Sequence, residues 1–216
     1  DIQITLTQRE KDDYLAKGIG PASKMIPVYS GIELGPYLTP GAGRGRMRAR
    51  LGLAERDVAA GTVARLVPVK NHGMIIDAAE LLRDRAPQVK FVFVGDGELR
   101  AALERRVEAL GLANRFVFTG WRNDVADIMP AFDVFVMTSK NEGLGRAFIE
   151  AQASGVPVIG TRVGGVAEVL DPGKTGLLVE PGDAQGLADA LALLAADQSL
   201  RGRMAQACRP WVVPRF

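Results

Sequence analysis

One segment of this 216-residue chain combines residue types that suit a ligand rich in hydroxyls and phosphate. Between Ser139 and Glu150 it carries two carboxylates, Glu142 and Glu150, with Gly143 and Gly145 after the first. Glycines allow a ligand to approach the backbone closely and leave amide N–H groups free to point outward. Eight helical residues span about 12 Å, a separation that suits two hydroxyl-bearing parts of one elongated ligand. One carboxylate could then accept hydrogen bonds from a sugar and the other from a ribose diol. The alternative is that Glu142 is a helix-terminal charge and Glu150 a surface residue.

Two cations lie close together in a second segment. Arg65 and Lys70 flank Pro68, and Asn71 and His72 follow at the start of a predicted helix. Two cations in front of a helix N-terminus suit a pyrophosphate, because its charge is spread over several oxygens that also accept hydrogen bonds from free N–H groups. The alternative is that Arg65 pairs with a structural carboxylate and that Lys70 is solvated.

A third segment, Gly120-Trp121-Arg122, carries an indole and a guanidinium. These two groups are able to flank a planar base. The alternative is that Trp121 packs against neighbouring loops.

Each of the three segments follows a short apolar run that predicts a strand, and helical patterns separate most of these runs. Such alternation predicts an α/β fold, a doubly wound, Rossmann-like parallel sheet with right-handed crossovers. Ligands of such sheets bind beyond the carboxyl ends of the strands. The predicted strands are Val58–Leu66, Val89–Val94, Phe116–Thr119, Val134–Thr138, Val156–Gly160 and Gly176–Val179, and the predicted helices are His72–Arg85, Glu98–Leu110, Val125–Met129, Ala147–Ser154, Val166–Leu170, Ala184–Ala195 and Gln198–Ala207.

The first forty residues have a different pattern. Alternation of apolar and polar residues over Asp1–Thr7 predicts a short half-buried strand, a polar helical stretch follows to about Lys17, and Lys24–Ser30 predicts a second strand. The Pro- and Gly-rich passage from Gly35 to Gly45 predicts a linker. We therefore place a domain boundary near residue 36.

Composition excludes several classes of protein. The 27 basic and 25 acidic residues give a net charge of +2, which argues against a protein built to wrap nucleic acid. No apolar run approaches the roughly 18 residues of a membrane span. Because His72 is the only histidine, no histidine-based metal cluster is expected. The single cysteine, Cys208, predicts a buried thiol in a reducing compartment.

Two further glycine motifs do not carry a function. The run from Gly95 to Arg100 begins like a dinucleotide fingerprint, but Arg100 stands at its sixth position, where the fingerprint has Gly or Ala. It predicts a tight strand-to-helix turn. Gly173-Lys174-Thr175 resembles the end of a phosphate-binding loop, but a strand follows it where that loop requires a helix. It predicts a turn before the strand.

Taken in order, the motifs resemble the carboxyl-terminal half of retaining glycosyltransferases of family 4. The spacing of Glu142 and Glu150 is similar to that family's signature, two glutamates with seven residues between them. Asn71 and Glu33 stand where the family more often has Gly and Asp. The other matching runs are Val63–Lys70, Phe93–Gly97, Phe118–Gly120, Ser154–Ile159, Val163–Val169, Thr175–Val179 and, at the interdomain joint, Ser30–Glu33.

The resemblance implies a GT-B architecture, in which an amino-terminal domain binds the acceptor and a carboxyl-terminal domain binds a nucleotide sugar. It implies that Arg65 and Lys70 hold the donor diphosphate and act with Glu142 in catalysis. No bound metal or other cofactor is implied, because the cations stabilise the charge that grows on the leaving diphosphate.

The same resemblance assigns the donor-binding residues. Glu150 is expected at the ribose hydroxyls, and Glu142 with the amide groups of the following turn at the transferred sugar and phosphate. The remaining donor-binding residues are Gly143, Leu144 and Gly145 in that turn, and Gly120, Trp121 and Arg122 beside the base.

We expect residues 1–36 to be a remnant of the acceptor domain and the joint, and residues 37–216 to be the donor-binding domain. The resemblance implies a hexosyltransferase of bacterial polysaccharide or glycolipid biosynthesis that uses a UDP- or GDP-sugar, is cytoplasmic, and associates peripherally with the membrane through the missing domain. Without that domain we expect no transfer. The alternatives are a non-catalytic nucleotide-sugar-binding module and a sugar-nucleotide epimerase of the same architecture.

Overall fold

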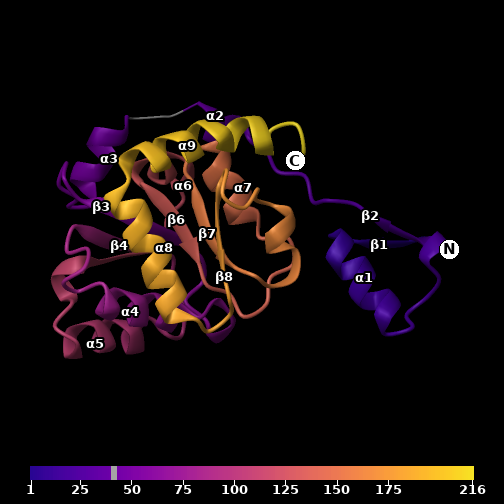
Figure 1. Cartoon of the computed structure of the whole chain (residues 1–216), viewed down its shortest axis with the longest axis horizontal. Coiled ribbons are helices and arrows are strands. Elements are labelled where there is room, and N and C mark those ends of the chain that lie inside the picture. The colour runs from indigo at the N-terminus through magenta and orange to yellow at the C-terminus, as the bar shows by residue number, and fades with distance from the viewer. Residues whose placement is uncertain (40–42) are drawn as a thin grey trace.

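The computed structural model describes residues 1–39 and 43–216. A six-stranded parallel sheet with helices on both faces forms the main body, and a small amino-terminal unit stands beside it (Figure 1). The α/β fold with a doubly wound parallel sheet, predicted from the alternation of strands and helices, is confirmed.

The strands of the main sheet run in the order β5-β4-β3-β6-β7-β8, and all neighbouring pairs are parallel. The register pairs Val58 with Val89 between β3 and β4, and Ala60 with Val134 between β3 and β6. The six strands are β3 (Val58–Val63), β4 (Val89–Val94), β5 (Phe116–Gly120), β6 (Val134–Met137), β7 (Val158–Thr161) and β8 (Gly176–Val179). All six agree with the strands predicted from the sequence to within three residues at each end.

Two apolar clusters lie on the two faces of the sheet. Alternate residues of β4 supply both, because Phe91 and Phe93 belong to one cluster and Val92 and Val94 to the other. The first cluster packs under α4 (His72–Leu81), α5 (Arg100–Ala109) and α8 (Ala184–Ala196), and the second under α3 (Arg44–Arg50), α6 (Val125–Ile128), α7 (Arg146–Ala153) and the end of α9 (Gln198–Val212). Burial on both faces explains the continuous apolar runs of the strands.

The 3-10 helices complete the chain between these elements. One of them, η5 (Gly164–Glu168), replaces the α-helix predicted over Val166–Leu170. The others are η1 (Ala22–Lys24), η2 (Pro68–Lys70), η3 (Ala113–Arg115) and η4 (Met129–Ala131).

The amino-terminal unit, residues 1–27, consists of β1 (Gln3–Thr5), α1 (Gln8–Ala16), η1 and β2 (Met25–Pro27). Its two strands pair in parallel, with Ile4 opposite Ile26. The predicted burial of the apolar residues of β1 is wrong, because Ile4 is 68% exposed and Thr5 is 1% exposed. The pair therefore presents an apolar face to solvent.

The passage predicted as a linker, Gly35 to Gly45, is largely helical at its two described ends. Its first part forms α2 (Gly35–Leu38), and α3 begins at Arg44. Residues 40–42 of this passage lie outside the described residues. The glycines that flank α3 predicted a linker and no helix. In the structure Arg48 of α3 is buried and donates to Asp133 at 3.0 Å, and this contact outweighs the glycines.

The predicted burial of the Cys208 thiol is confirmed. The last helix, α9, extends beyond its predicted end at Ala207 to Val212. Gly173–Thr175 is a turn before β8, with Thr175 buried. Within the described part of the chain, none of the helices combines the length and apolar character needed to cross a membrane.

Candidate functional site

The site lies where the sheet topology changes direction. From β3 the chain proceeds to β4 and β5 on one side, whereas β6, β7 and β8 lie on the other side. Loops that leave the carboxyl ends of β3 and β6 therefore diverge and open a crevice, which is where doubly wound sheets bind ligands. Lys70 follows β3 and Glu142 follows β6, so the topology places both at this crevice.

Lys70 and Glu142 form an ion pair across the crevice. Lys70 Nζ lies 2.5 Å from Glu142 Oε2, and Ser139 Oγ donates to the same oxygen at 3.1 Å. Both charged side chains are largely covered, with side-chain exposures of 21% and 15%. Neither a freely solvated Lys70 nor a simple helix-terminal Glu142 agrees with this geometry. Sequence reasoning did not identify Ser139, although it stands at the start of the same segment.

The turn after Glu142 brings backbone toward the crevice. Gly145 has φ 75°, and a Cβ there would lie 2.7 Å from the Phe148 ring, so only glycine fits without strain. Leu144 is buried beneath the turn, and α7 begins at Arg146. The turn delivers the helix N-terminus, with its unpaired N–H groups, to the same place as Lys70.

A cavity of about 380 Å³ opens at this point, which we call the Glu142 cavity. Val63 and Ala64 from the end of β3 line it on one side, and Leu6 of the amino-terminal unit also contributes. Lys70, Glu142, Gly143, Leu144 and Gly145 complete this part of the wall.

A second cavity of about 150 Å³, the Trp121 cavity, adjoins the first. Both are lined by Val63 and Ala64, so together they follow the carboxyl edge of the sheet from β6 to β5. Arg65, Trp121 and Arg122 line this second cavity. Thus the structure brings Arg65 together with Trp121 and Arg122, and Lys70 together with Glu142.

Trp121 and Arg122 differ in how they are held. Trp121 is 77% exposed, which contradicts simple packing against neighbouring loops. Arg122 forms a two-pronged pair with Asp124, at 2.8 and 2.5 Å, and this pairing lowers the pKa of the Asp124 carboxyl. The indole is therefore free to meet a ligand, whereas the guanidinium is oriented by a partner that the sequence analysis did not identify.

The turn from Gly95 to Arg100, which does not match the dinucleotide fingerprint, supports the Trp121 cavity. Arg100 pairs with Asp96 at 2.9 Å and with Glu104 at 2.9 Å. Hydrogen bonds from the Gly97 N–H and from Arg100 lower the pKa of Asp96. A Cβ at Gly120 would lie 2.9 Å from the Arg100 guanidinium, so the residue that breaks the fingerprint packs against the loop before Trp121.

Glu150 lies in α7 beside Tyr37 of α2. Burial raises the pKa of Glu150, and the neighbouring Tyr37 hydroxyl and the positive charge of Arg146 oppose the rise. Burial and the neighbouring carboxylate raise the pKa of Tyr37 to about 12. Glu150 is therefore a half-buried carboxylate with a phenol partner, contrary to the alternative of a surface residue. Sequence reasoning missed Tyr37, which lies in the segment predicted as a linker.

The two residues that follow Lys70 have an unusual backbone conformation, at Asn71, and a buried side chain, at His72. Asn71 has φ 50°, in the left-handed region that glycine adopts most easily. His72 begins α4 and is 1% exposed, and burial together with Lys70 lowers its pKa to about 4. The imidazole is therefore neutral at pH 7. Among residues 1–39 and 43–216, no group of three or more His, Cys, Asp and Glu side chains is placed to hold a metal ion.

Residues 43–211 match the sequence profile of a family described as glycosyl transferases group 1. This chain belongs to that family. It is 34% identical over 99% of its length to the GDP-mannose-dependent alpha-(1-6)-phosphatidylinositol monomannoside mannosyltransferase of Mycolicibacterium smegmatis, and spans 58% of that protein. It is also 32% identical to the lipopolysaccharide core biosynthesis glycosyltransferase LpsE of Rhizobium meliloti, over 98% of this chain and 74% of LpsE.

Solved structures of group 1 and related glycosyltransferases share the fold. Anabaena Alr3699/HepE, crystallised in complex with UDP, superposes with a TM-score of 0.92 at 29% identity over 100% of this chain and 59% of HepE. The carboxyl-terminal domain of LpcC from Francisella tularensis superposes with a TM-score of 0.76 at 27% identity, covering 86% of this chain and 98% of that domain. The chain thus spans somewhat more than half of several relatives and nearly all of an isolated carboxyl-terminal domain.

Proposed function

We propose that this chain binds the nucleotide-sugar donor of a retaining glycosyltransferase of family 4. The observation that carries the proposal is the pair of adjoining cavities at the carboxyl edge of the sheet. One combines a lysine, a carboxylate and a glycine turn, and the other combines an arginine and an exposed indole. That order matches a ligand with a sugar and a diphosphate at one end and a base at the other.

In this proposal the diphosphate bridges Arg65 and Lys70. Lys70 Nζ lies 2.5 Å from Glu142 Oε2. A diphosphate oxygen that takes over Lys70 releases the Glu142 carboxylate toward the sugar, where it accepts hydrogen bonds from hydroxyl groups. As the glycosidic bond breaks, negative charge grows on the leaving diphosphate, and the two cations and the Gly143–Gly145 amides stabilise it without a metal.

The rest of the donor extends along the same edge. The base lies by Gly120, Trp121 and Arg122, where the exposed indole supplies a stacking surface. The ribose hydroxyls donate to Glu150. HepE has been crystallised with UDP and with UDP-glucose, and the mycobacterial relative is named GDP-mannose-dependent, so both UDP- and GDP-sugars are donor candidates.

Transfer also needs an acceptor-binding domain. We propose that residues 1–36 belong to such a domain and to the joint, and that residues 37–216 bind the donor. Parallel strands are normally found in sheets covered on both faces, whereas Ile4 of β1 and Ile26 of β2 are exposed. The flanking Ile2 and Val28 are exposed as well. Further strands and helices of an amino-terminal α/β domain would cover this face. The acceptor is then a glycan or a lipid-linked glycan, and that domain brings the enzyme to the cytoplasmic face of the membrane.

Calorimetric titration of the 216-residue chain with UDP, GDP, UDP-glucose and GDP-mannose, without added metal, tests the proposal. Lys70→Ala removes a charge-assisted contact of about 1.5–3 kcal/mol, so we expect affinity for the bound nucleotide to fall at least about tenfold. Lys174→Ala is the matched control, because Lys174 is 75% exposed and pairs with Asp171 outside both cavities. Equal affinity of the two variants would contradict the assignment of Lys70, and no binding by the unaltered chain would contradict the proposed function.

A further inference from the structure

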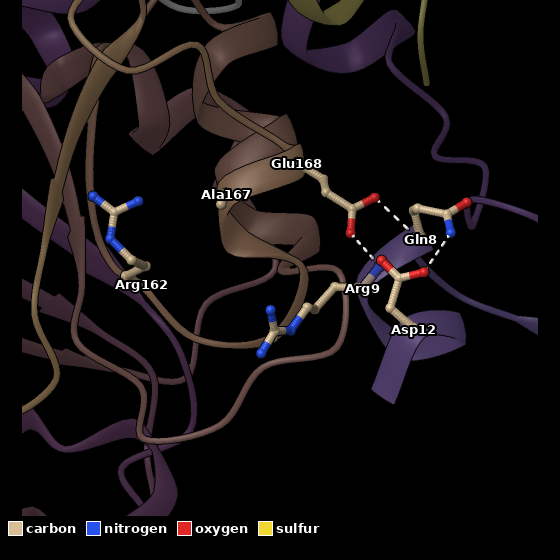
Figure 2. A pocket seen from close by; sticks show the side chains of 7 residues that line it. Gln8, Arg9, Asp12, Arg162, Ala167 and Glu168 are labelled. Carbon is tan, nitrogen blue, oxygen red and sulfur yellow. Dashed lines mark hydrogen bonds between the residues drawn. The ribbon is translucent and has the colours of Figure 1, made fainter. Parts of the chain in front are cut away.

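Glu168 joins the main body to the amino-terminal unit. The carboxylate stands at the end of η5, and its two oxygens accept the backbone N–H groups of Gln8 at 3.0 Å and Arg9 at 2.8 Å (Figure 2). Tyr29, on the segment that leaves β2, donates its hydroxyl to Glu168 Oε2 at 2.7 Å. One side chain therefore holds both the start of α1 and the chain that follows the amino-terminal unit.

The contact is a helix cap supplied from a distant part of the sequence. The first N–H groups of a helix have no partner within the helix, and a carboxylate at that end is also attracted by the helix dipole. Thr7 caps the Glu10 N–H at 3.0 Å, and Glu10 in turn accepts the Leu6 N–H at 2.6 Å. Because these local bonds already close the helix start, the Glu168 contact serves mainly to dock α1 on the body.

The docked helix start reaches the Glu142 cavity through close backbone contacts. Thr7 is 1% exposed, and a Cβ at Gly165 would lie 2.4 Å from Thr7 Cγ2, so α1 packs directly on the Gly165 backbone. The Gly165 N–H donates to the Gly143 carbonyl at 2.8 Å. Leu6, one residue before Thr7, lines the Glu142 cavity together with Gly143.

We propose that Glu168 is a positioning residue that couples the docking of α1 to the sugar side of the donor site. It acts through Thr7 and Gly165 on the Gly143 turn, and through Leu6 on the cavity wall. This inference rests on the proposed function, because it concerns how that donor site is shaped. It adds that the amino-terminal unit completes the sugar end of the site and leaves the base end unaffected.

The two cavities make this distinction measurable. The Trp121 cavity is lined by segments that follow β3, β4 and β5 and by Val125 of α6. The amino-terminal unit contributes to the Glu142 cavity through Leu6. Loss of α1 docking should therefore weaken binding of a complete nucleotide sugar more than binding of the nucleoside diphosphate alone.

The test compares Glu168→Ala and Glu168→Gln with the unaltered 216-residue chain. The control is Glu180→Ala, which removes a 65% exposed carboxylate whose partner is Arg162, at 2.9 Å. Hydrogen exchange of the Gln8 and Arg9 amides reports docking. Calorimetry with UDP, UDP-glucose, GDP and GDP-mannose reports discrimination between each nucleotide and its sugar-bearing form.

For Glu168→Ala we expect exchange at Gln8 and Arg9 to accelerate about fivefold, the ratio that corresponds to about 1 kcal/mol. Affinity for the sugar nucleotide should fall about fivefold, the ratio that corresponds to a helix cap of about 1 kcal/mol. Affinity for the nucleoside diphosphate should stay within about twofold. Glu168→Gln, which keeps one acceptor oxygen, should lie between the two, and Glu180→Ala should match the unaltered chain.

Unchanged exchange in Glu168→Ala would overturn the docking role. Faster exchange with equal losses for nucleotide and sugar nucleotide, or with no loss of either, would overturn the coupling and leave the proposed function intact. Absence of nucleotide binding by the unaltered chain would overturn the proposed function, and the coupling with it.

Discussion

The buried imidazole of His72 makes the stability of this protein depend on pH in a defined interval. His72 is 1% exposed at the start of α4, and its ring lies 5.1 Å from the Phe93 ring, edge to face. Burial, and secondarily the charge of Lys70, lower its pKa from 6.5 to about 4. The unfolded chain therefore binds a proton at this residue between pH 6.5 and pH 4 that the folded chain does not bind.

The magnitude follows from that difference of pKa. One pKa unit corresponds to about 1.4 kcal/mol, so a fall from 6.5 to about 4 corresponds to about 3.5 kcal/mol. Since the unfolded state holds the extra proton, the free energy of unfolding rises with pH across this interval. As pH falls from 6.5 towards 4, the protein loses this contribution to its stability. Above pH 7, both states are neutral at His72 and the contribution is constant.

The assay is urea unfolding of the unaltered chain and of His72→Phe at half-unit steps from pH 4.5 to pH 8. We expect the free energy of unfolding of the unaltered chain to decline more steeply below pH 6.5, by up to about 1.4 kcal/mol per pH unit relative to the variant. His72→Gln is a second non-titrating variant, so that a packing defect of one substitution does not decide the result. Only the difference in slope is read, because either substitution also shifts the whole curve. Parallel curves for all three proteins between pH 4.5 and pH 8 would refute the reasoning.

Three further predictions concern stability and the site. Arg48→Ala should lower the free energy of unfolding by about 3 kcal/mol in denaturant titrations, because it removes hydrogen-bond partners from Asp133 and from buried carbonyls. The control Arg46→Ala, at an exposed position, should change it by no more than about 0.5 kcal/mol. Similar losses in the two variants would contradict the role assigned to Arg48. Gly145→Ala should lower the free energy of unfolding by about 1–2 kcal/mol and weaken nucleotide binding in calorimetry, because the φ of Gly145 is 75°. The control Gly202→Ala, in an open helical position, should raise the free energy of unfolding by about 0.5–1 kcal/mol. An unchanged free energy of unfolding for Gly145→Ala would argue against a strained turn. Tyr37→Phe removes the hydroxyl that lowers the pKa of Glu150. As pH falls, nucleotide affinity measured by calorimetry should therefore decline at a higher pH in this variant than in the unaltered chain, and superimposable pH profiles would count against the pairing.

Much of the fold could be predicted from the sequence because its signals are local. A strand buried on both faces needs an apolar run, and Val89–Val94, interrupted only by Lys90, shows such a run at the bounds that β4 has. A helix that covers a sheet needs a periodic apolar face, as α8 has. The location of the site at the ends of β3, β5 and β6 followed from the same alternation, because parallel strands place their carboxyl ends on one edge.

Local patterns also misled in two places. Apolar alternation over β1 predicted burial of Ile4, yet the side of a strand that is covered depends on what packs on it, and here Thr5 is buried and Ile4 is exposed. Glycines and prolines around residue 40 predicted a linker, yet Arg48 stabilises α3 through Asp133, 85 residues later in the chain. In both places contacts with distant residues overrode the local propensity.

By itself, the sequence determined the class of fold, the family resemblance and the segments that carry the site, because strand and helix patterns and motif spacing are properties of neighbouring residues. Only the tertiary structure decided which groups meet. Lys70 pairs with Glu142 across 72 positions, and Glu168 caps α1 across 160. These meetings depend on β3 and β6 being neighbours at the switch point and on where the amino-terminal unit docks. Strand order and docking arise from packing of the whole chain, which no short window of residues encodes.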